Sequence, residues 1–385
     1  MRNGTPGFRP ERLRAAREAR SMSGASLAEL AGVTRAAISQ YERGEQTPSP
    51  MVLQRIADAV NLPQQHFLAS IHSVESPVFY RSFASALKRS RLRAERRLEW
   101  LQEIVNYLSA SIEFPAINLP DFSTSNVFGL NGDEIEDIAT KVRRHWGLGD
   151  GPIPHMVRLA ENNGVITARQ FLDSDHLDAF SYWPDQGKHP LVVLSSDKEC
   201  AVRSRYDLAH EIGHLVLHRH IRASQLTSKS DFKKLELQAN RFAGAFLLPA
   251  KTFLEELYSL TLDAFLALKS RWLVSVALMV RRCEDLGVLN EDLAHRLWIN
   301  LGRRGWRRRE PLDDDLLIEQ PLFLTRCFEL LVSTGPTAKD VLLSKLPWTA
   351  TEIEELVGLP ERLLQPHEND PPAIEPRIIR FPGVG

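Results

Sequence analysis

Residues 206–220 read Tyr-Asp-Leu-Ala-His-Glu-Ile-Gly-His-Leu-Val-Leu-His-Arg-His. His210 and His214 are four positions apart, and such positions share one face of an α-helix, so both imidazoles can reach one metal ion. Glu211 lies beside them, where its carboxylate can take a proton from a water molecule that the metal activates. The flanking apolar residues predict a buried helix. Because H-E-x-x-H also occurs by chance on ordinary helices, a metal site needs a third ligand.

Glu236 is the best candidate for this third ligand. It follows His214 by 22 positions (236 − 214), a spacing that suits a second helix packed antiparallel to the first across a turn. Asn240 lies one helical turn after Glu236 and faces the same site. Its carbonyl oxygen can accept the second ring N–H of a metal-binding histidine, a partner that such histidines normally have.

Two other histidines are weaker candidates for the third ligand. His220 stands ten positions after His210, but that arrangement requires a sharp turn at a glycine where this sequence has Leu217. His218 continues the helix face of the first two histidines. Three ligands along one straight helix would spread over about 12 Å, too far to reach a single ion.

The two segments together resemble a known family. Ala209–His218 fits the pattern A-H-E-x-G-H-x-x-L-H, and Glu236–Pro249 reads E-L-Q-A-N-R-F-A-G-A-F-L-L-P, as in the ImmA/IrrE family of zinc metallopeptidases. Many members carry a second acidic residue where this chain has Gln238. The resemblance implies a zincin-like, gluzincin-type domain that cleaves a repressor and so switches on its operon under stress. Zn²⁺ would be held by His210, His214 and Glu236, with Glu211 as the general base.

Peptide hydrolysis also needs a donor that polarises the carbonyl oxygen together with the metal. The sequence does not single out one residue for this role. The weak candidates are Tyr206, His218, Tyr182 and Arg271.

The N-terminal region, residues 8–68, is almost entirely helical by pattern. A short helix over Ser26–Ala31 is closed by Gly32, and Thr34 is a good N-cap for a second helix over Arg35–Tyr41. Two short helices joined through a glycine are typical of a helix-turn-helix. Leu27–Ser49 closely resembles the XRE (Cro/C1-type) repressor domain, through the pattern L-A-x-x-A-G-V-T-x-x-x-I-S-x-Y-E-R-G-x-x-x-P-S.

This second resemblance implies double-stranded operator DNA as a partner. Arg35 or Gln40 could bond base edges in the major groove. Arg12 is a further candidate for phosphate contact, which positions the protein without specifying sequence. Gly24 stands where many relatives have a DNA-contacting Gln. The alternative is a helix-turn-helix used only for protein contacts. The groove-facing set is Arg35, Ala36, Ala37, Ser39 and Gln40, and the other phosphate contacts are Thr34 and Arg43.

Composition is that of an ordinary globular protein of two or three domains. The 385 residues are 43% apolar and 25% charged, with a net charge of −1. The first 110 residues contain 16 basic and 10 acidic residues, which leaves −7 for the rest and weakly favours nucleic acid at the N-terminal half. No apolar run of about 20 residues, no signal peptide and an odd number of cysteines predict a cytoplasmic protein without a disulfide framework or membrane span.

The pattern predicts a mainly α protein with a small antiparallel β-sheet, an α+β fold. The strands are expected at 164–168, 179–182 and 190–194, just before the H-E-x-x-H helix, and the edge strand of such a sheet can hold an extended peptide. A long basic helix before them is either a solvated connector or a surface that guides nucleic acid. The acidic run Glu310–Asp315 suggests a solvated loop. The expected domains are 1–70 (helix-turn-helix), 71–131 (basic connector and linker), 132–310 (peptidase), 311–365 (small helical region) and 366–385 (a Pro-rich disordered tail).

The sequence therefore predicts a DNA-binding transcriptional regulator with zinc-dependent endopeptidase activity. Its protein substrate would be a repressor, or the chain itself, in a stress or mobile-element response. Helix-turn-helix domains usually act as dimers on two half-sites, so a homodimer is expected. Two alternatives remain: a regulator that senses a ligand without hydrolysis, and an antitoxin-like DNA-binding partner of a toxin. A strand-like segment in the tail, Arg377–Phe381, could lie along the sheet edge and block the cleft.

Overall fold

The computed structural model describes most of the chain. It covers residues 4–70, 79–80, 88–122, 126–174, 177–184, 188–197, 199–221, 225–226, 228–335 and 337–365. The tail at 366–385, with its strand-like Arg377–Phe381 segment, lies outside the described residues, as does part of the expected linker at 71–131. No helix in the described part of the chain is both long and apolar enough to cross a membrane.

A small sheet lies at the centre of the molecule, in the order β1-β3-β4-β2. The expected strands at 164–168, 179–182 and 190–194 appear within two residues of these bounds, and Phe79 and Tyr80 add a further edge strand. The sheet is mixed, whereas an entirely antiparallel one was predicted: β3 pairs antiparallel with β1 and β4, but β2 pairs parallel with β4. β3 comes between β2 and β4 in the chain but lies on the other side of β4 in the sheet. β2 and β4, which run in the same direction, are therefore neighbours. The bounds are β1 Phe79–Tyr80, β2 Ile166–Gln170, β3 Ala179–Tyr182 and β4 Leu191–Ser195.

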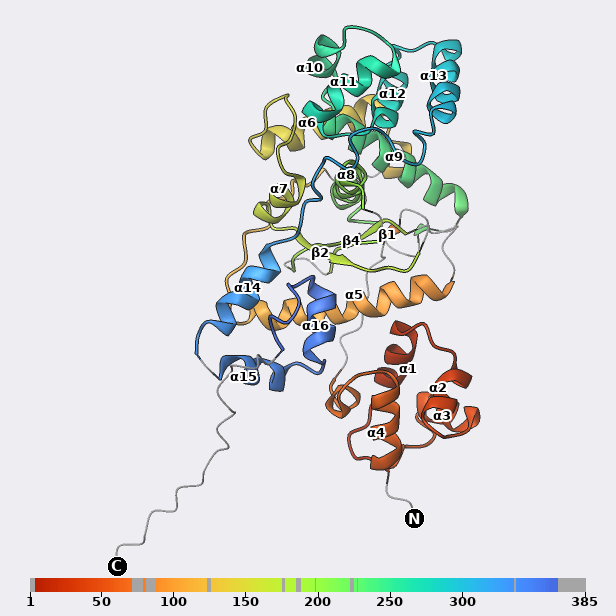
Figure 1. Cartoon of the computed structure of the whole chain (residues 1–385), viewed down its shortest axis with the longest axis vertical. Helices are drawn as coiled ribbons and strands as arrows, with labels where there is room; N and C mark the ends of the chain where they lie inside the picture. Colours follow the sequence, from red (N-terminus) through yellow and green to blue (C-terminus); the bar gives the residue numbers. More distant parts are fainter. Residues whose placement is uncertain are drawn as a thin grey trace, which may run out of the picture.

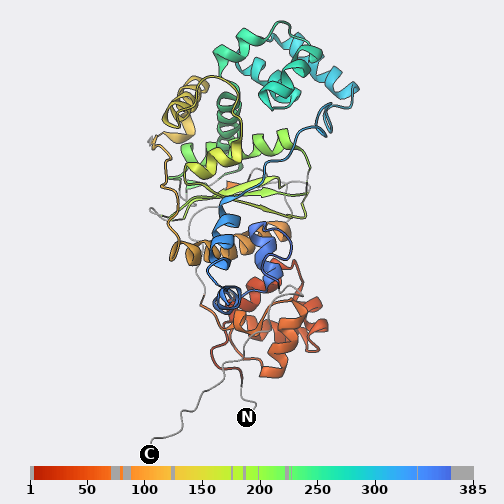
Figure 2. The ribbon, with the colours of Figure 1, turned by 60° about the vertical axis from the view of Figure 1, so that its left-hand side comes forward.

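Helices cover both faces of this sheet (Figures 1 and 2). Alternate side chains of a strand point to opposite faces, so Ala179 packs in one hydrophobic cluster and Phe180 in the other. The face that carries Ala179 is covered by α8 (Ala201–Leu217), and behind it lie α6, α7 and α9. The opposite face is covered by α5 and by the C-terminal helices. The other bounds are α6 Gly132–His145, α7 Met156–Asn162, α9 Lys229–Leu247, α5 Lys88–Ser109, α14 Phe323–Val332, α15 Ala338–Lys345 and α16 Ala350–Val357.

The close approach of α8 and α9 depends on a glycine. A Cβ placed on Gly213 would lie 3.0 Å from Cδ1 and 3.3 Å from Cβ of Phe242, closer than side chains normally pack. Phe242 is fully buried and stacks on Phe246, so it has little room to move. The glycine inside the H-E-I-G-H motif therefore lets the second helix lie against the first.

Four further helices, α10 (Ala250–Glu256), α11 (Leu262–Trp272), α12 (Val276–Asp285) and α13 (Glu291–Arg303), form the end of the molecule farthest from the N-terminal domain (Figure 1). On α11, Nζ of Lys269, a residue without exposed surface, lies 2.8 Å from Glu310 and 2.6 Å from Asp313. The interpretation of Glu310–Asp315 as a solvated loop is wrong for these two carboxylates, which are buried because they neutralise a buried lysine.

The N-terminal domain is a compact group of short helices at the other end of the molecule, below α5 in Figure 1. Ser23 caps one of these helices and Thr34 caps the next, with its Oγ1 accepting from the backbone N–H of Ala37 at 3.1 Å. Gly32 in the turn between them has φ +62°, a conformation that favours glycine. The bounds are α1 Pro10–Ala19, α2 Gly24–Leu30, α3 Arg35–Glu42, α4 Pro50–Ala59 and the 3₁₀ turn η1 Gln64–Phe67.

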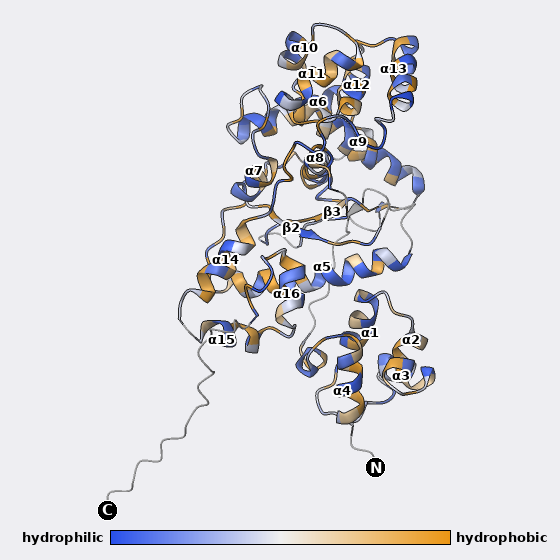
Figure 3. Ribbon diagram, viewed as in Figure 1, coloured by the Kyte–Doolittle hydropathy of each residue, from blue (hydrophilic) through white to orange (hydrophobic). Residues whose placement is uncertain are grey.

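This domain packs directly against α5 and the C-terminal helices. One hydrophobic cluster runs from Leu13 in α1 through Trp100 in α5 to Trp348 before α16. The connector and the small C-terminal region were expected as separate units, but here they share a core with the helix-turn-helix and with one face of the sheet. α5 is hydrophilic along much of its length (Figure 3), but its apolar side chains are buried in this shared core. The helix is therefore not a solvated connector.

Ion pairs accompany this packing and use the basic residues of α5. Arg97 is 4% exposed and lies 2.9 Å from Glu352 of α16, a carboxylate that also pairs with Arg20 at the end of α1. Arg96 pairs with Glu18 at 2.9 Å. Because these side chains neutralise carboxylates inside the protein, the proposal that this part of the helix guides nucleic acid loses its support.

Candidate metal centre and DNA-binding face

Two histidines and a glutamate from α8 and α9 converge on one point. Nε2 of His210 and Nε2 of His214 lie 3.1 Å apart, and the Glu236 carboxylate oxygens lie 3.4 Å from the first and 3.3 Å from the second. Both histidines are fully buried, whereas the Glu236 side chain is 23% exposed. The expected ligands therefore lie together, within reach of one ion and close to the surface.

These spacings fit zinc. Nitrogen and oxygen ligands at about 2.0–2.1 Å from a tetrahedral zinc ion lie roughly 3.3 Å from one another. Two imidazoles and one carboxylate are also a donor set that zinc takes in catalytic sites, where a fourth position stays open. The residues present thus suit the ion that the motif implies.

A hydrogen bond to the side-chain oxygen of Asn240 orients His210. Oδ1 of Asn240 lies 3.1 Å from Nδ1 of His210 and accepts a second bond, of 2.6 Å, from the Tyr206 hydroxyl. An amide oxygen only accepts, so Nδ1 of His210 carries the proton and Nε2 presents its lone pair toward Glu236. Asn240 thus lies where the sequence placed it, and Tyr206 takes a positioning contact that the sequence did not predict.

A second chain of hydrogen bonds lies behind His214 and is called the His218–Gln238 relay below. The sequence did not predict it. Nδ1 of His218 is 2.9 Å from Nδ1 of His214, and Nε2 of His218 is 3.0 Å from Oε1 of Gln238. The Gln238 amide N–H in turn donates to the carbonyl of Val127 at 2.8 Å, which fixes the orientation of this amide. Burial and the adjacent His214 lower the pKa of His218 well below its ordinary value, so its ring is neutral.

A neutral imidazole has one N–H. His218 donates that N–H to Gln238 and must accept at Nδ1 from His214, which leaves the Nε2 lone pair of His214 directed toward His210 and Glu236. Both ring nitrogens of His218 are therefore occupied, by His214 and by Gln238, and its assignment as a carbonyl-polarising donor is wrong. Gln238, which the sequence showed only as a departure from the acidic pattern, is the residue that holds it.

Glu211 lies under the sheet without exposed surface. Its Oε2 accepts a 2.6 Å hydrogen bond from the Ser181 hydroxyl of β3, while its Oε1 has no partner among the described residues. Burial, opposed by His214 and by the Ser181 bond, raises the pKa of Glu211 to about 7. A buried carboxylate oxygen with no partner suits the acceptance of a proton at the metal centre. Ser181 was missed, although strand alternation places it with Ala179 on the face toward α8.

Two other expected donors lie elsewhere. Tyr182 follows Ser181 in β3, so its side chain points to the opposite face of the sheet and packs in the cluster with α5. Arg271 lies on α11, where its guanidinium pairs with Glu256 at 2.6 Å. Of the four candidates, Tyr206 remains, because its hydroxyl bonds Asn240 beside His210.

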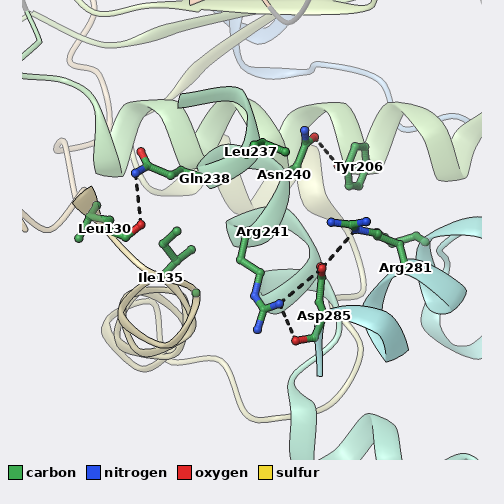
Figure 4. Close-up of a pocket in the computed structure, with 11 residues that line it drawn as sticks. Leu130, Ile135, Tyr206, Leu237, Gln238, Asn240, Arg241, Arg281 and Asp285 are labelled. Carbon is green, nitrogen blue, oxygen red and sulfur yellow. Dashed lines mark hydrogen bonds and ion pairs between the residues drawn. The ribbon is translucent and has the colours of Figure 1, made fainter. Parts of the chain in front are cut away.

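The carboxylate of Glu236, the expected third ligand, is held in its charged form. Burial opposes this, but the adjacent His210 and His214 outweigh it and lower the pKa of Glu236 to about 2. Next to the ligands a pocket of about 570 Å³ opens between α6, α8, α9 and α12. Tyr206 and Asn240 form one side of it, and Arg241 and Arg281, both paired with Asp285, form the other (Figure 4).

The expected DNA contacts lie on or next to α3. Thr34, Arg35, Ala36 and Arg43 are exposed, whereas Ser39 and Gln40 are half-buried. Arg43 pairs with Glu45 at 2.5 Å and bonds the Ser39 hydroxyl. Each of these side chains is therefore at least partly accessible on one helix of the domain.

Arg12 does not belong to this face. It is 1% exposed, and its guanidinium lies 2.7 Å from Glu103 of α5 and also bonds the carbonyl of Ser70. Its assignment as a phosphate contact is wrong, because α1 turns this side chain into the interface with α5.

Family comparisons agree with both halves of the structure. Residues 13–63 match the family model described as a helix-turn-helix, and residues 160–284 match that of the Peptidase M78 family, described as an IrrE N-terminal-like domain. No curated protein matches the chain. The second match spans β2, β3, β4 and the helices that carry His210, Glu211, His214 and Glu236. The chain thus carries an XRE-type helix-turn-helix domain followed by an IrrE N-terminal-like domain of the M78 peptidase family.

Proposed function

We propose that this protein is a DNA-binding transcriptional regulator with zinc-dependent endopeptidase activity. The observation that carries the peptidase half is the arrangement of hydrogen-bond partners around the expected ligands. Asn240 and the His218–Gln238 relay direct the Nε2 lone pairs of His210 and His214 toward the Glu236 carboxylate. Two helices that only pack against each other do not require histidine lone pairs oriented in this way.

Each residue of the site has a distinct task. His210, His214 and Glu236 would hold Zn²⁺, which when bound lowers the pKa of a water molecule and polarises the carbonyl oxygen of a peptide bond. Glu211 accepts a proton at Oε1 and passes it to the amide nitrogen that leaves. Ser181 keeps the other oxygen of that carboxylate in place, and the surrounding core excludes bulk water from it.

The helix-turn-helix domain supports an operator as the second partner. Arg35 is exposed at the start of α3 and can reach base edges, with Thr34 and Arg43 placed beside it for phosphate oxygens. A protein that binds an operator and hydrolyses a polypeptide fits the control of a promoter by removal of a repressor. The repressor substrate, the homodimer and the stress signal are parts of this proposal.

A Glu211→Gln variant tests the hydrolytic half, with unstructured β-casein as the probe. We expect the variant to bind one zinc per chain and to bind DNA like the wild type, but to cleave casein 10²- to 10⁴-fold more slowly, since only the proton acceptor is lost. If the variant cleaves as fast as the wild type, the hydrolytic proposal is wrong. A regulator that only senses a ligand would show no cleavage by either protein.

A further inference from the structure

The sheet carries a strand that comes from outside the peptidase region. β1 lies at the sheet edge and pairs antiparallel with β3, with Phe79 opposite Ser181 and Tyr80 opposite Phe180. The peptidase family match begins at residue 160 and the helix-turn-helix match ends at residue 63. β1 therefore belongs to the segment between the two regions, and without it β3 would be the edge of the sheet.

This edge lies beside the catalytic carboxylate. Ser181, the residue opposite Phe79, donates the 2.6 Å hydrogen bond to Glu211. Neighbouring strands lie about 4.8 Å apart, so the main chain at Phe79 is one strand spacing from the residue that holds Glu211. The Oε1 atom of Glu211, for which the described part of the chain supplies no partner, belongs to the same carboxylate.

An extended polypeptide that binds to a sheet edge is held by main-chain hydrogen bonds, whatever its side chains are. The segment at Phe79 and Tyr80 is bound to β3 in this manner. It thus occupies the position that an extended substrate would take beside Glu211.

We propose that β1 is a substrate of the chain's own peptidase site, and that the bond cleaved is the one between Phe79 and Tyr80. This inference rests on the endopeptidase activity proposed above. In the reaction, water adds its oxygen to the Phe79 carbonyl carbon and the C–N bond to Tyr80 breaks. Glu211 moves the proton from the water to the new amine of Tyr80, so no other reactant is needed.

The cut opens the edge of β3 rather than releasing the DNA-binding domain. That domain is also held on α5 by the Arg12–Glu103 pair and by the shared hydrophobic cluster. After cleavage the strand is no longer tethered at both of its ends, so it can leave β3 and another polypeptide can take its place. The uncut chain is thus the precursor of a peptidase that acts on other proteins.

Intact mass spectrometry of the full chain tests this inference. The protein is prepared without metal, Zn²⁺ is added, and samples are followed over time. We expect two fragments, one ending at Phe79 and one beginning at Tyr80, and a first-order rate that does not change with protein concentration. Glu211→Gln should bind zinc and remain intact. Cleavage only at another bond would overturn the assignment.

A pair of double variants isolates the strand pairing, with β-casein as the probe. Phe79→Pro with Tyr80→Pro removes both N–H groups from the strand, so casein cleavage should begin at once. Phe79→Ala with Tyr80→Ala keeps both N–H groups, so casein cleavage should show the lag of the wild type while the chain is first cut.

The outcomes separate this inference from the function on which it rests. A wild-type chain that stays intact yet hydrolyses casein from the start overturns self-cleavage and leaves the peptidase function standing. If neither the wild type nor the double proline variant hydrolyses casein with one zinc bound, the peptidase function itself fails.

Discussion

The ring of His218 lies directly behind that of His214, with their Nδ1 atoms 2.9 Å apart. A histidine that the motif offered as a ligand thus supports a ligand instead. In the proposed zinc site, the affinity for the ion should therefore depend on a side chain that does not touch it.

We expect His218→Phe to weaken zinc binding about 10- to 100-fold, because His214 loses the acceptor that fixes its tautomer while the buried volume stays filled. Zinc titration against a competing chelator measures this change. His220→Phe is the matched control: that ring is 49% exposed and contacts Asp121 on the surface, so zinc affinity should not change. Equal affinities in the wild type and both variants would show that the relay does not support the site.

The two glutamates near Arg97 allow a second comparison. Glu352 is 3% exposed and pairs with both Arg97 and Arg20, whereas Glu355 is 60% exposed and lies 3.8 Å from Arg97. We expect Glu352→Gln to lower the free energy of unfolding by about 3–5 kcal/mol, because it leaves a buried guanidinium without its carboxylate.

Glu355→Gln removes the same charge at the surface and should cost less than about 1 kcal/mol. Urea unfolding of the two variants, followed by tryptophan fluorescence, gives both values. Similar losses in the two variants would mean that the ion pairs of Glu352 with Arg97 and Arg20 do not hold α16 to α5 and to the end of α1.

The candidate ligand set could be predicted from the sequence because helical periodicity and motif spacing are local properties. The pairs His210–His214 and Glu236–Asn240 follow from turns of 3.6 residues, and the structure brings the first three of these expected residues together with Asn240 beside His210. The capping of α3 by Thr34 also follows from local chemistry.

The residues that the sequence did not reveal depend on tertiary packing. Ser181 reaches Glu211 only because β3 lies against α8, and Arg12 becomes an interface residue only because α1 packs on α5. Burial of Glu310 depends on Lys269, which is 41 positions away (310 − 269). Contacts of this kind join residues that are far apart in the sequence and follow no helix or strand periodicity. A single sequence therefore does not reveal them.

His66 provides a pH-dependent contribution to stability. It is fully buried against Trp100 and Trp348, and its Nδ1 donates to the carbonyl of Pro347 at 3.0 Å. Burial, followed by the charge of Arg12, lowers the pKa of His66 to about 3 from an ordinary value of 6.5. The unfolded chain therefore binds a proton between these values while the folded chain does not.

The contribution of neutral His66 is complete above pH 6.5 and falls with pH until it is lost near pH 3. Between pH 7 and pH 5 the loss is about 2 kcal/mol, at roughly 1.4 kcal/mol per pH unit below 6.5. His66→Phe should be less stable at pH 7, yet its stability should depend less on pH by this amount. Urea unfolding at several pH values measures both slopes, and identical slopes would contradict the assignment.

Arg35 and Arg43 differ in what they should contribute to DNA binding. Arg35 is exposed at the first position of α3, where it can reach base edges, whereas Arg43 lies at the C-cap of the same helix. We expect Arg35→Ala to weaken binding by about 1–3 kcal/mol and to relax base preference, and Arg43→Ala to weaken binding to all sequences alike. Duplexes selected by the wild-type protein from a random pool provide the operator for these measurements.

Salt dependence distinguishes the two roles further. Loss of a phosphate contact in Arg43→Ala should reduce the slope of log affinity against log salt by about one, whereas loss of a base contact in Arg35→Ala should change mainly the ranking of sequences. Arg12→Ala should leave that slope unchanged, because its guanidinium is occupied by Glu103 inside the protein. An unchanged base preference in Arg35→Ala would show that α3 does not read the major groove through this residue.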